Sequence, residues 1–282
     1  MNIKEAFNLT KQKLQKAGVS DPAFDTVYLF EHIFSLSRTD ITVYGDKVAD
    51  ESKLNELSEC VKRRTEGEPV QYIIGKWYFM GNTFEVAPGV LIPRDDTEVL
   101  VNACLNLLKN RKSAKIVDLC SGSGIIAITL KKHFENAYVC AVEKSETAYS
   151  YLTKNAQLND AFIKAIHADL YDCVDEFEDG SLDLLVSNPP YIKSDEIPTL
   201  QREVQFEPTL ALDGGKDGYD FYKGIISLWS RKLKVNGFIA FELGEGQFEY
   251  VRELLKKAGF TDIRGYLDLG GTIRALSAIY NP

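Results

Sequence analysis

The sequence predicts an α/β protein in which a small helical domain precedes a doubly wound, mainly parallel sheet. Two observations support this prediction. From Asp95 onward, short apolar and β-branched runs alternate with longer stretches in which apolar residues recur at helical spacing. Before residue 72, helical patterns dominate. Because strands that alternate with helices pair in parallel, helices should cover both faces of the sheet.

The region of residues 1–72 is expected to form the helical domain. Three helical segments are expected there: residues 2–18, 20–36 and 50–67. In the second segment, Asp21 is placed to cap the helix and Pro22 takes its first position. The third segment runs from an acidic start to a basic end, as the helix dipole favours. Small appended domains of this kind usually hold a partner or a substrate, so we expect a role in recognition.

Residues 73–90 are expected to form a β-hairpin that links the two domains. Aromatic and β-branched residues dominate this stretch, and Gly75, Gly81 and Gly89 interrupt it. Residues 91–282 then make up the second domain.

The second domain is expected to contain alternating helices and strands. Helices are expected over residues 96–110, from Gly124, and over residues 146–157, 219–233 and 246–258. Strands are expected over residues 115–119, 137–143, 162–169, 182–188, 237–243, 262–268 and 272–280. Only a short turn separates the last two strands. They should therefore add an antiparallel edge to the sheet, because parallel neighbours need a long crossover.

Composition and charge limit the class of protein. The chain of 282 residues is 45% hydrophobic and carries a formal net charge of -8. No stretch approaches the roughly 18 uncharged apolar residues of a membrane span, and the first residues lack a signal-peptide pattern, so a cytoplasmic location is expected. The five cysteines are widely spread and none forms a C-x-x-C pair, which indicates reduced thiols and no metal site. The acidity argues against a protein whose main task is to bind nucleic acid.

A glycine-rich loop, "DLCSGSG", follows the first expected strand of the sheet. In doubly wound sheets, ligands bind beyond the carboxyl ends of the strands. Gly122 and Gly124 let the backbone turn tightly and approach a ligand. Glu143 closes the next strand and is placed to accept hydrogen bonds from ribose hydroxyls. The sequence therefore predicts a nucleoside site at this loop.

The same loop also matches a dinucleotide fingerprint, since Gly122, Gly124 and Ala127 satisfy G-x-G-x-x-A. A nicotinamide dehydrogenase is therefore an alternative, and a glycine-rich turn without a ligand is another. Asp118 separates the two liganded alternatives. Its carboxylate would repel a pyrophosphate, whereas it suits a cationic ligand that carries an ammonium and a sulfonium group. This favours S-adenosylmethionine.

The stretch Asn188, Pro189, Pro190 and Tyr191 follows the fourth expected strand, at the same edge of the sheet. Paired prolines fix the backbone and lack N–H donors, so their carbonyls are free to accept hydrogen bonds. The Asn188 side-chain oxygen and the Pro189 carbonyl can accept both hydrogens of an NH2 group, while Tyr191 offers a flat face. An amide nitrogen held in this way needs no strong base. We therefore predict that these four residues are catalytic and bind the substrate.

Several segments of the chain resemble a known family. The loop "DLCSGSG" is similar to the first motif of class I methyltransferases, with Cys120 where another glycine is common. Together with it, the following segments resemble, in order and spacing, the N5-glutamine methyltransferases that modify peptide chain release factors: "EPVQYIIG", "VAPGVLIPRDDTEVLV", "SNPPYI", "FEPTLALDGGKDGYDFYKGI" and "FELGEGQ". Asp95 stands where the family commonly has proline, and either residue suits the first turn of a helix.

The resemblance implies a Rossmann-like class I methyltransferase fold, with a seven-stranded sheet that is mainly parallel and has an antiparallel edge. It implies S-adenosyl-L-methionine as cofactor, with S-adenosyl-L-homocysteine as product. The implied cofactor-binding residues are Asp118, Cys120, Ser121, Gly122, Ser123, Gly124, Glu143, Asp169, Leu170 and Asn188. The implied substrate is the glutamine in the Gly-Gly-Gln loop of a release factor, which the helical domain grips. We expect a monomer that forms no stable complex with nucleic acid or membrane.

Other functions remain open on the sequence. A methyltransferase that acts on glutamine in a ribosomal protein would use the same motifs, and so would one that acts on N6 of adenine or N2 of guanine. A dehydrogenase or a non-catalytic nucleoside-binding module would leave Asn188 to Tyr191 without a purpose. Residues 207–222 are expected either to close over the site or to form a simple turn before a helix. Arg94 and Glu98 are expected either to support the pocket or to cap the neighbouring helix.

Overall fold

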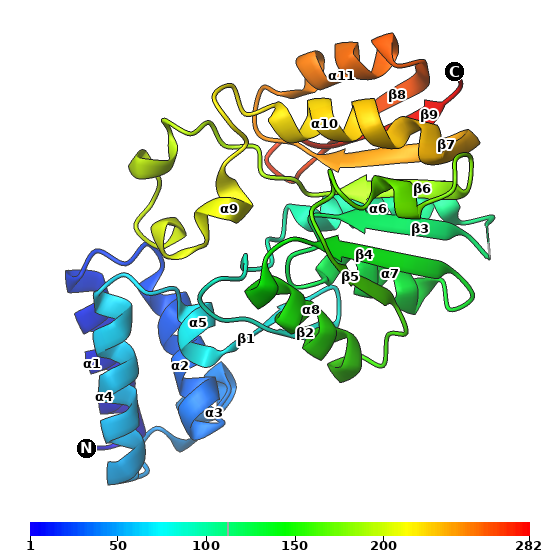
Figure 1. The fold of residues 1–282 in the computed structure, drawn as a ribbon. Coiled ribbons are helices and arrows are strands. Elements are labelled where there is room, and N and C mark those ends of the chain that lie inside the picture. The colour runs from blue at the N-terminus through cyan, green and yellow to red at the C-terminus, as the bar shows by residue number, and fades with distance from the viewer. Residues whose placement is uncertain (112) are drawn as a thin grey trace. The chain divides into compact units, whose positions relative to one another are not determined.

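The computed structural model describes residues 1–111 and 113–282, and the chain divides into two compact units. One unit comprises Met1–Lys76 and Gln201–Phe206, and the other comprises Trp77–Leu200 and Glu207–Pro282. Figure 1 shows the helices of the first and the sheet of the second. No sequence pattern assigned the segment Gln201–Phe206 to the helical unit.

The helical unit contains five helices. These are α1 (Ile3–Lys16), α2 (Pro22–Phe34), α3 (Arg38–Tyr44), α4 (Glu51–Thr65) and α5 (Val70–Ile74). The Asp21 side chain accepts a hydrogen bond from the Phe24 N–H and so caps α2, as the sequence predicts. Leu14, Leu29 and Phe30 are fully buried in its core. The short helix α3 has no counterpart among the sequence-predicted elements.

A buried ion pair holds Gln201–Phe206 on the helical unit. Arg64 of α4 is 4% exposed. Its Nε donates to Asp25 Oδ2 at 2.6 Å, and its Nη2 donates to Glu203 Oε1 at 2.7 Å. A buried charge is tolerated when it is paired and hydrogen-bonded, so these two carboxylates account for the burial of Arg64.

The segment between the helices and the sheet forms the expected hairpin, from β1 (Lys76–Phe79) and β2 (Asn82–Glu85). Its turn places Met80 at φ 44° and Gly81 at φ 77°, the paired left-handed residues of a tight hairpin. Asn155 joins β2 to α8 (Glu146–Leu158), because its Oδ1 accepts from Glu85 N at 2.7 Å and its Nδ2 donates to Glu85 O at 3.1 Å.

The large sheet has seven strands in the order β5-β4-β3-β6-β7-β9-β8. Their bounds are β3 (Lys115–Leu119), β4 (Tyr138–Glu143), β5 (Lys164–His167), β6 (Leu182–Ser187), β7 (Leu233–Glu242), β8 (Phe260–Leu267) and β9 (Ile273–Tyr280). Strand β9 is antiparallel to both β7 and β8, and the other pairs are parallel. The predicted parallel sheet with an antiparallel edge is confirmed. The strand order reverses at β3, where α/β sheets bind their ligands.

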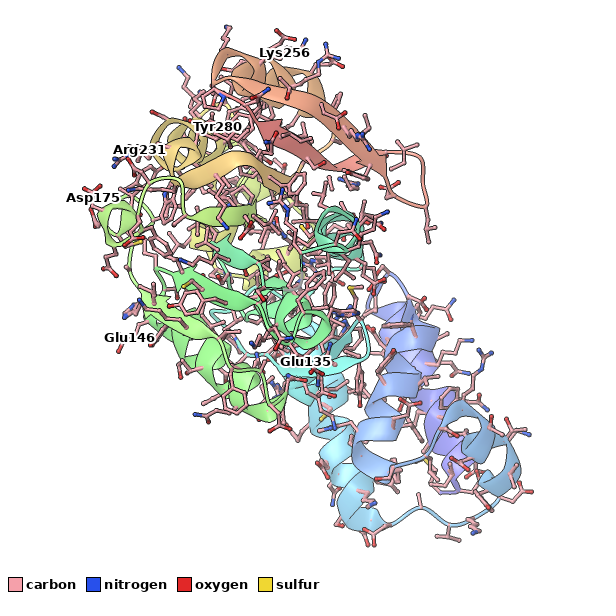
Figure 2. All side chains as sticks on the ribbon, turned by 90° about the vertical axis from the view of Figure 1, so that its right-hand side faces the viewer. Glu135, Glu146, Asp175, Arg231, Lys256 and Tyr280 are labelled. Carbon is pink, nitrogen blue, oxygen red and sulfur yellow. The ribbon has the colours of Figure 1, made fainter. Side chains whose placement is uncertain are left out.

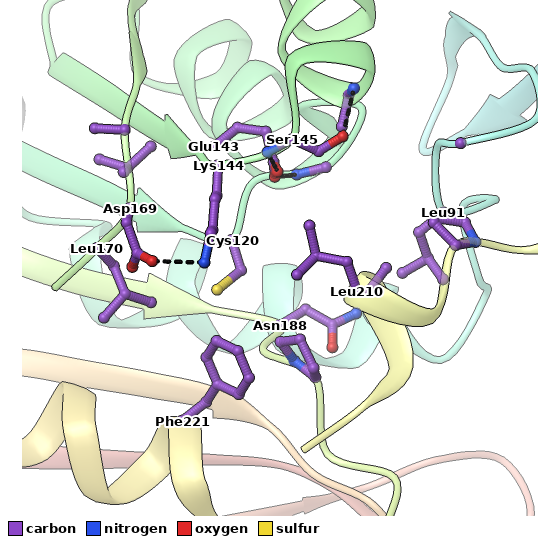
Figure 3. Close-up of a pocket in the computed structure, with 18 of the residues that line it drawn as sticks. Leu91, Cys120, Glu143, Lys144, Ser145, Asp169, Leu170, Asn188, Leu210 and Phe221 are labelled. Carbon is purple, nitrogen blue, oxygen red and sulfur yellow. Dashed lines mark hydrogen bonds and ion pairs between the residues drawn. The ribbon is translucent and has the colours of Figure 1, made fainter. Parts of the chain in front are cut away.

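Helices cover both faces of this sheet (Figure 1). Besides α8, they are α6 (Thr97–Leu108), α7 (Ile125–His133), α10 (Asp220–Trp229) and α11 (Phe248–Lys257). The short helix α9 (Thr209–Leu212) lies apart from the strands in Figure 1, and 3-10 turns occur at Val174–Glu176, Ile197–Thr199, Val204–Phe206 and Ser230–Lys232. Alternation along β3 divides the core, because Ile116 packs with α6 and α7 whereas Val117 packs with α10 and α11.

Charged side chains lie on the outside of the sheet unit. Glu146 and Lys256 point outward in Figure 2, and Arg231 pairs with Asp175 at 2.7 Å on the surface. Surface pairs of this kind add little to stability. No helix within the described residues is both long and apolar enough to cross a membrane.

Candidate active site

A pocket opens at the carboxyl ends of the parallel strands, beside the reversal of strand order (Figure 3). Four neighbouring strands each contribute a residue that directly follows them: Cys120 after β3, Lys144 after β4, Ala168 after β5 and Asn188 after β6. The cavity has a volume of about 770 Å³, open solvent at its mouth included.

The pocket brings together six of the ten residues that the sequence assigns to the cofactor. They are Cys120, Gly122, Glu143, Asp169, Leu170 and Asn188. The other four, which the described lining does not include, are Asp118, Ser121, Ser123 and Gly124. Of the predicted substrate-binding stretch, Asn188 and Pro190 line the pocket, whereas Pro189 and Tyr191 are not among its described lining residues.

The glycine-rich loop uses three residues in the left-handed region of φ. Gly122 has φ 55°, and a Cβ added there would meet no atom within 4 Å, so its backbone conformation is what favours glycine. Gly124 has φ 87°, and an added Cβ would lie 2.5 Å from Leu152 Cδ1. Cys120 has φ 59°. This conformation costs a residue with a side chain about 1–2 kcal/mol, which accounts for the glycine common at this position in the family that the chain resembles.

Glu143 at the end of β4 holds the loop and also faces the pocket (Figure 3). Its Oε2 accepts from Gly122 N at 2.8 Å, and its Oε1 accepts from Ser145 N at 2.7 Å. Burial raises the pKa of Glu143, although these N–H donors act to lower it. Each carboxylate oxygen keeps a second lone pair. Glu143 can therefore accept hydrogen bonds from neighbouring hydroxyls on a bound ribose.

Asp118 lies beneath the loop, fully buried. Its Oδ2 accepts from Ala127 N at 3.2 Å, which ties the end of β3 to the start of α7. Its Oδ1 has no hydrogen-bond partner among the described residues. Burial raises the pKa of Asp118 to about 8. Asp118 thus supports the loop from the interior. With a pKa of about 8 it is protonated at neutral pH, so it has no negative charge there to attract a cationic ligand, unlike the carboxylate considered from the sequence.

The adenine end of the expected ligand site contains an ion pair that the sequence analysis missed. Asp169 Oδ2 lies 2.8 Å from Lys144 Nζ (Figure 3), and Asp169 Oδ1 accepts from Tyr171 N at 3.0 Å. Burial acts to raise the pKa of Asp169, but these two partners lower it on balance. The position of Lys144, directly after Glu143 at a strand end, is the sequence signal that could have identified it.

Apolar side chains form the walls of the pocket. Leu170 is 4% exposed, and Phe221 from α10 faces the same space (Figure 3). Leu91 and Leu210 line it from other parts of the chain. Apolar walls with a few fixed polar groups suit a planar heterocycle and its sugar. The predicted adenine contact of Leu170 remains a prediction.

The stretch from Asn188 to Tyr191 is held in place from several sides. Before it, Ser187 Oγ donates to Leu119 O at 2.6 Å and so links β6 to β3. After it, Ile192 N donates to Leu212 O at 2.9 Å. The Tyr191 carbonyl accepts from Gln247 Nε2 at 3.0 Å, and the Tyr191 hydroxyl donates to Glu242 at 3.4 Å. Burial raises the pKa of Tyr191 well above its usual range, so the phenol stays neutral.

The Asn188 side chain lines the pocket, whereas the buried Pro189 is not among its described lining residues. Within the described part of the chain, neither Asn188 Oδ1 nor the Pro189 carbonyl accepts a hydrogen bond. Asn188 lines the same pocket as Glu143 and Cys120 (Figure 3). An NH2 group bound at Asn188 would therefore lie next to a ligand in the nucleoside pocket.

The segment 207–222 contributes to the pocket. Pro208, Leu210, Ala211 and Phe221 line it. Glu207 is held by an ion pair with Arg94 and by the Ile92 N–H, which donates to its Oε2 at 3.0 Å. Arg94 therefore fixes the start of this segment, a role that the sequence analysis had weighed only as support for the pocket or the helix.

The described residues contain no group of three or more His, Cys, Asp or Glu side chains placed to hold a metal ion. The five cysteines are free, and four of them are buried.

Comparisons with known proteins agree with this arrangement. The family model of the PrmC N-terminal domain matches residues 5–75, and that of the methyltransferase small domain matches residues 92–205. A release factor glutamine methyltransferase of Geobacter sulfurreducens is 36% identical over 275 residues, which is 97% of this chain and 95% of that protein. One of Fusobacterium nucleatum subsp. nucleatum is 35% identical over 277 residues, 97% of this chain and 78% of that protein.

The structure of a methyltransferase from Pyrococcus furiosus covers 72% of this chain and 91% of its own, with a TM-score of 0.53 and 18% sequence identity. This likeness shows the class I methyltransferase fold of the sheet unit. The sequence relatives match across both units of the chain. The chain therefore belongs to the release factor glutamine methyltransferase family.

Proposed function

We propose that this protein transfers a methyl group from S-adenosylmethionine to the side-chain amide nitrogen of the glutamine in the Gly-Gly-Gln loop of peptide chain release factors. One observation supports this most directly. Asn188, whose Oδ1 is available as an acceptor, lines the same pocket as the glycine-rich loop and Glu143. The relatives' names agree with the same substrate.

The pocket residues fit S-adenosylmethionine. Glu143 would accept the ribose hydroxyls, Leu170 and Phe221 would enclose the adenine ring, and Gly122 allows the backbone to approach the ligand. Lys144 and Asp169 would lie beside the adenine ring, and their opposite charges neutralise each other. When bound, the cofactor supplies an electrophilic methyl group on a sulfonium centre.

The chain's own part in the reaction is to position the substrate. A carboxamide nitrogen is a weak nucleophile because its lone pair is delocalised into the carbonyl. Asn188 Oδ1 and the Pro189 carbonyl would accept its two N–H bonds and aim the nitrogen at the methyl carbon, near a reacting distance of about 3–3.5 Å. The same acceptors would stabilise the positive charge that develops on nitrogen as the new N–C bond forms and the S–C bond of the sulfonium breaks, which leaves a neutral thioether product. The N-methylated amide then loses its extra proton to water.

We further propose that the helical unit grips the release factor. Two observations support this proposal. A separate family model matches residues 5–75, and the helical unit is distinct from the unit that contains the pocket. The net charge of -8 agrees with a protein partner rather than with nucleic acid.

The proposal is tested by incubating the protein with methyl-labelled S-adenosylmethionine and, in separate reactions, a purified release factor, ribosomal proteins and DNA. The label should appear on the release factor, and peptide mass spectrometry should place it on the glutamine of the Gly-Gly-Gln loop. A release factor in which that glutamine is replaced by glutamate is the matched control, and it should take no label. Label only on ribosomal protein or DNA would overturn the assignment.

A further inference from the structure

The Asn188 side-chain amide can take two orientations related by half a turn, and the Asn188–Tyr191 stretch does not by itself fix which one it takes. Its amide has an acceptor end and a donor end of nearly the same shape. Only the oxygen can accept an N–H bond from a substrate carboxamide. If the amide were rotated by half a turn, two NH2 groups would face each other and binding would be lost. Some neighbouring group must therefore fix which end faces the pocket.

Two buried residues behind Asn188 form a chain of hydrogen bonds with it. Asn188 Nδ2 lies 3.4 Å from Thr97 Oγ1, at the start of α6. Thr97 Oγ1 lies 2.6 Å from Glu242 Oε2, at the end of β7. Thr97 is fully buried and Glu242 is 2% exposed, so water does not compete for these contacts.

The direction of this chain follows from the donors that each group has. Thr97 has one hydroxyl hydrogen, and an ionised carboxylate can only accept. When Glu242 is ionised, the short contact between the two side chains therefore uses the Thr97 hydrogen. Thr97 Oγ1 then has only lone pairs to offer to Asn188. The NH2 end of Asn188 must face Thr97, which leaves its oxygen for the pocket.

We propose that Thr97 and Glu242 are positioning residues that hold the Asn188 amide with its oxygen toward the substrate. This inference rests on the proposed transfer to a carboxamide nitrogen, because that reaction is what requires the oxygen. Neither residue touches the reacting atoms. Thr97 lies in the segment "VAPGVLIPRDDTEVLV" and Glu242 in "FELGEGQ", and the sequence predicts no role for either side chain.

Other contacts of Glu242 support this role. The Tyr191 hydroxyl donates to Glu242 Oε1 at 3.4 Å, so one carboxylate is linked to both ends of the Asn188–Tyr191 stretch, directly to Tyr191 and through Thr97 to Asn188. Burial raises the pKa of Glu242 to about 7, although the Thr97 hydroxyl acts to lower it. A buried carboxylate is costly to keep, because ionisation of the group is disfavoured away from water. Orientation of the catalytic amide gives a functional reason for a carboxylate at this position.

The test compares Thr97→Val with Thr97→Ser in the full-length protein, at about pH 8, where Glu242 is ionised. Valine keeps the shape and removes the hydroxyl, whereas serine keeps the hydroxyl. We expect Thr97→Val to lower kcat for release-factor methylation by roughly 100-fold. Its Kd for S-adenosylmethionine, measured by calorimetry, should stay within about twofold, and Thr97→Ser should stay within roughly fivefold of the wild-type rate.

A double-mutant cycle distinguishes positioning from general structural support. In an Asn188→Ala background, Thr97→Val should cause no further loss in single-turnover rate, because there is no amide left to orient. Equal losses in both backgrounds would overturn the inference, as would a Thr97→Val variant with the wild-type kcat. A wild-type protein that methylates no release factor would instead overturn the proposed function and is a separate result.

A measurement on the wild-type protein covers the case in which Thr97→Val does not fold. Neutron diffraction of deuterated crystals locates the exchangeable hydrogens directly. Deuterium on Asn188 Nδ2 facing Thr97, and on Thr97 Oγ1 facing Glu242, is the expected result. The opposite amide orientation, with Oδ1 toward Thr97, would overturn the inference whatever the variants do.

Discussion

Glu143 Oε2 accepts a hydrogen bond from the backbone N–H of Gly122 at 2.8 Å. The side chain that is proposed to bind the ribose is thus also the one that fixes the shape of the glycine-rich loop. The second oxygen holds the Ser145 N–H at the start of α8. Loss of this carboxylate should therefore weaken ligand binding in two ways: it removes direct hydrogen bonds to the ligand, and it releases the glycine-rich loop.

We expect Glu143→Ala to raise the Kd for S-adenosylmethionine by at least 10- to 100-fold, since hydrogen bonds to charged groups contribute about 1.5–3 kcal/mol each. Glu143→Gln keeps the size and one acceptor oxygen, so its loss should be smaller. Isothermal titration calorimetry on both variants measures this. Equal affinities for Glu143→Ala and the wild type would remove Glu143 from the cofactor site.

Asp118 predicts a pH dependence of stability. Its pKa is about 8 in the folded protein against an ordinary value of 3.8, because it is fully buried. Between these values the folded chain binds a proton that the unfolded chain releases. The free energy of unfolding should therefore fall as the pH rises from about 4 to 8, by up to about 1.4 kcal/mol per unit of pH from this group.

The matched variant for this effect is Asp118→Asn, which has the same shape and no titration. Thermal unfolding of the ligand-free protein across this pH range should show a shallower fall in Tm for the variant than for the wild type. Glu242, with its pKa raised to about 7, adds a fall of the same sign to both proteins. Parallel Tm curves for the two proteins would show that Asp118 is ionised in the fold throughout.

The ion pairs of Arg64 with Asp25 and Glu203 should contribute to the stability of the helical unit, which includes Gln201–Phe206. Replacing it by Met would leave Asp25 and Glu203 without their cation, and Asp25 is 5% exposed. Removing one member of a buried ion pair costs about 3–5 kcal/mol. Urea unfolding should show a loss of this order for Arg64→Met.

Glu203→Gln is the milder control for the same contact. The Glu203 side chain is 28% exposed, so solvent weakens its attraction to Arg64. In the Glu203→Gln variant, Arg64 also remains paired with Asp25. We expect the loss for Glu203→Gln to be clearly smaller than for Arg64→Met. An equal or larger loss would mean that the pair with Glu203, rather than with Asp25, accounts for the burial of Arg64.

The sequence predicts most of the sheet because its strands are buried on both faces. The run from Leu182 to Ser187 is buried throughout, and such runs between helical patterns are typical of parallel strands. The ends of strands are harder to predict from the sequence where the backbone is irregular. Strand β7 begins at Leu233, whereas the sequence predicts a strand from residue 237. Asn236 takes φ 62° and the pairing with β6 shifts register there, so the backbone of this part of the strand is irregular. Asn236 and Gly237 together look like a turn in the sequence.

The polar contacts of the site were harder to predict than its location. The motif spacing placed Glu143 and Asn188 at one edge of the sheet, and the pocket contains both. The pairs Thr97–Glu242 and Arg64–Glu203 join residues far apart in the chain, and only the folded backbone brings them together. Lys144 was missed because a lysine after a strand is common on surfaces, and only the folded structure shows that it lines the pocket, 2.8 Å from Asp169.

The central claim is that Asn188 accepts an N–H bond of the glutamine that is methylated. Its most direct test is the single-turnover rate of methyl transfer to a release factor by wild type and Asn188→Ala, both saturated with S-adenosylmethionine. The account predicts a fall of roughly 100- to 1,000-fold in the variant, as for the loss of one transition-state hydrogen bond, with cofactor affinity within about threefold of wild type. An unchanged rate of transfer to the same glutamine would contradict it.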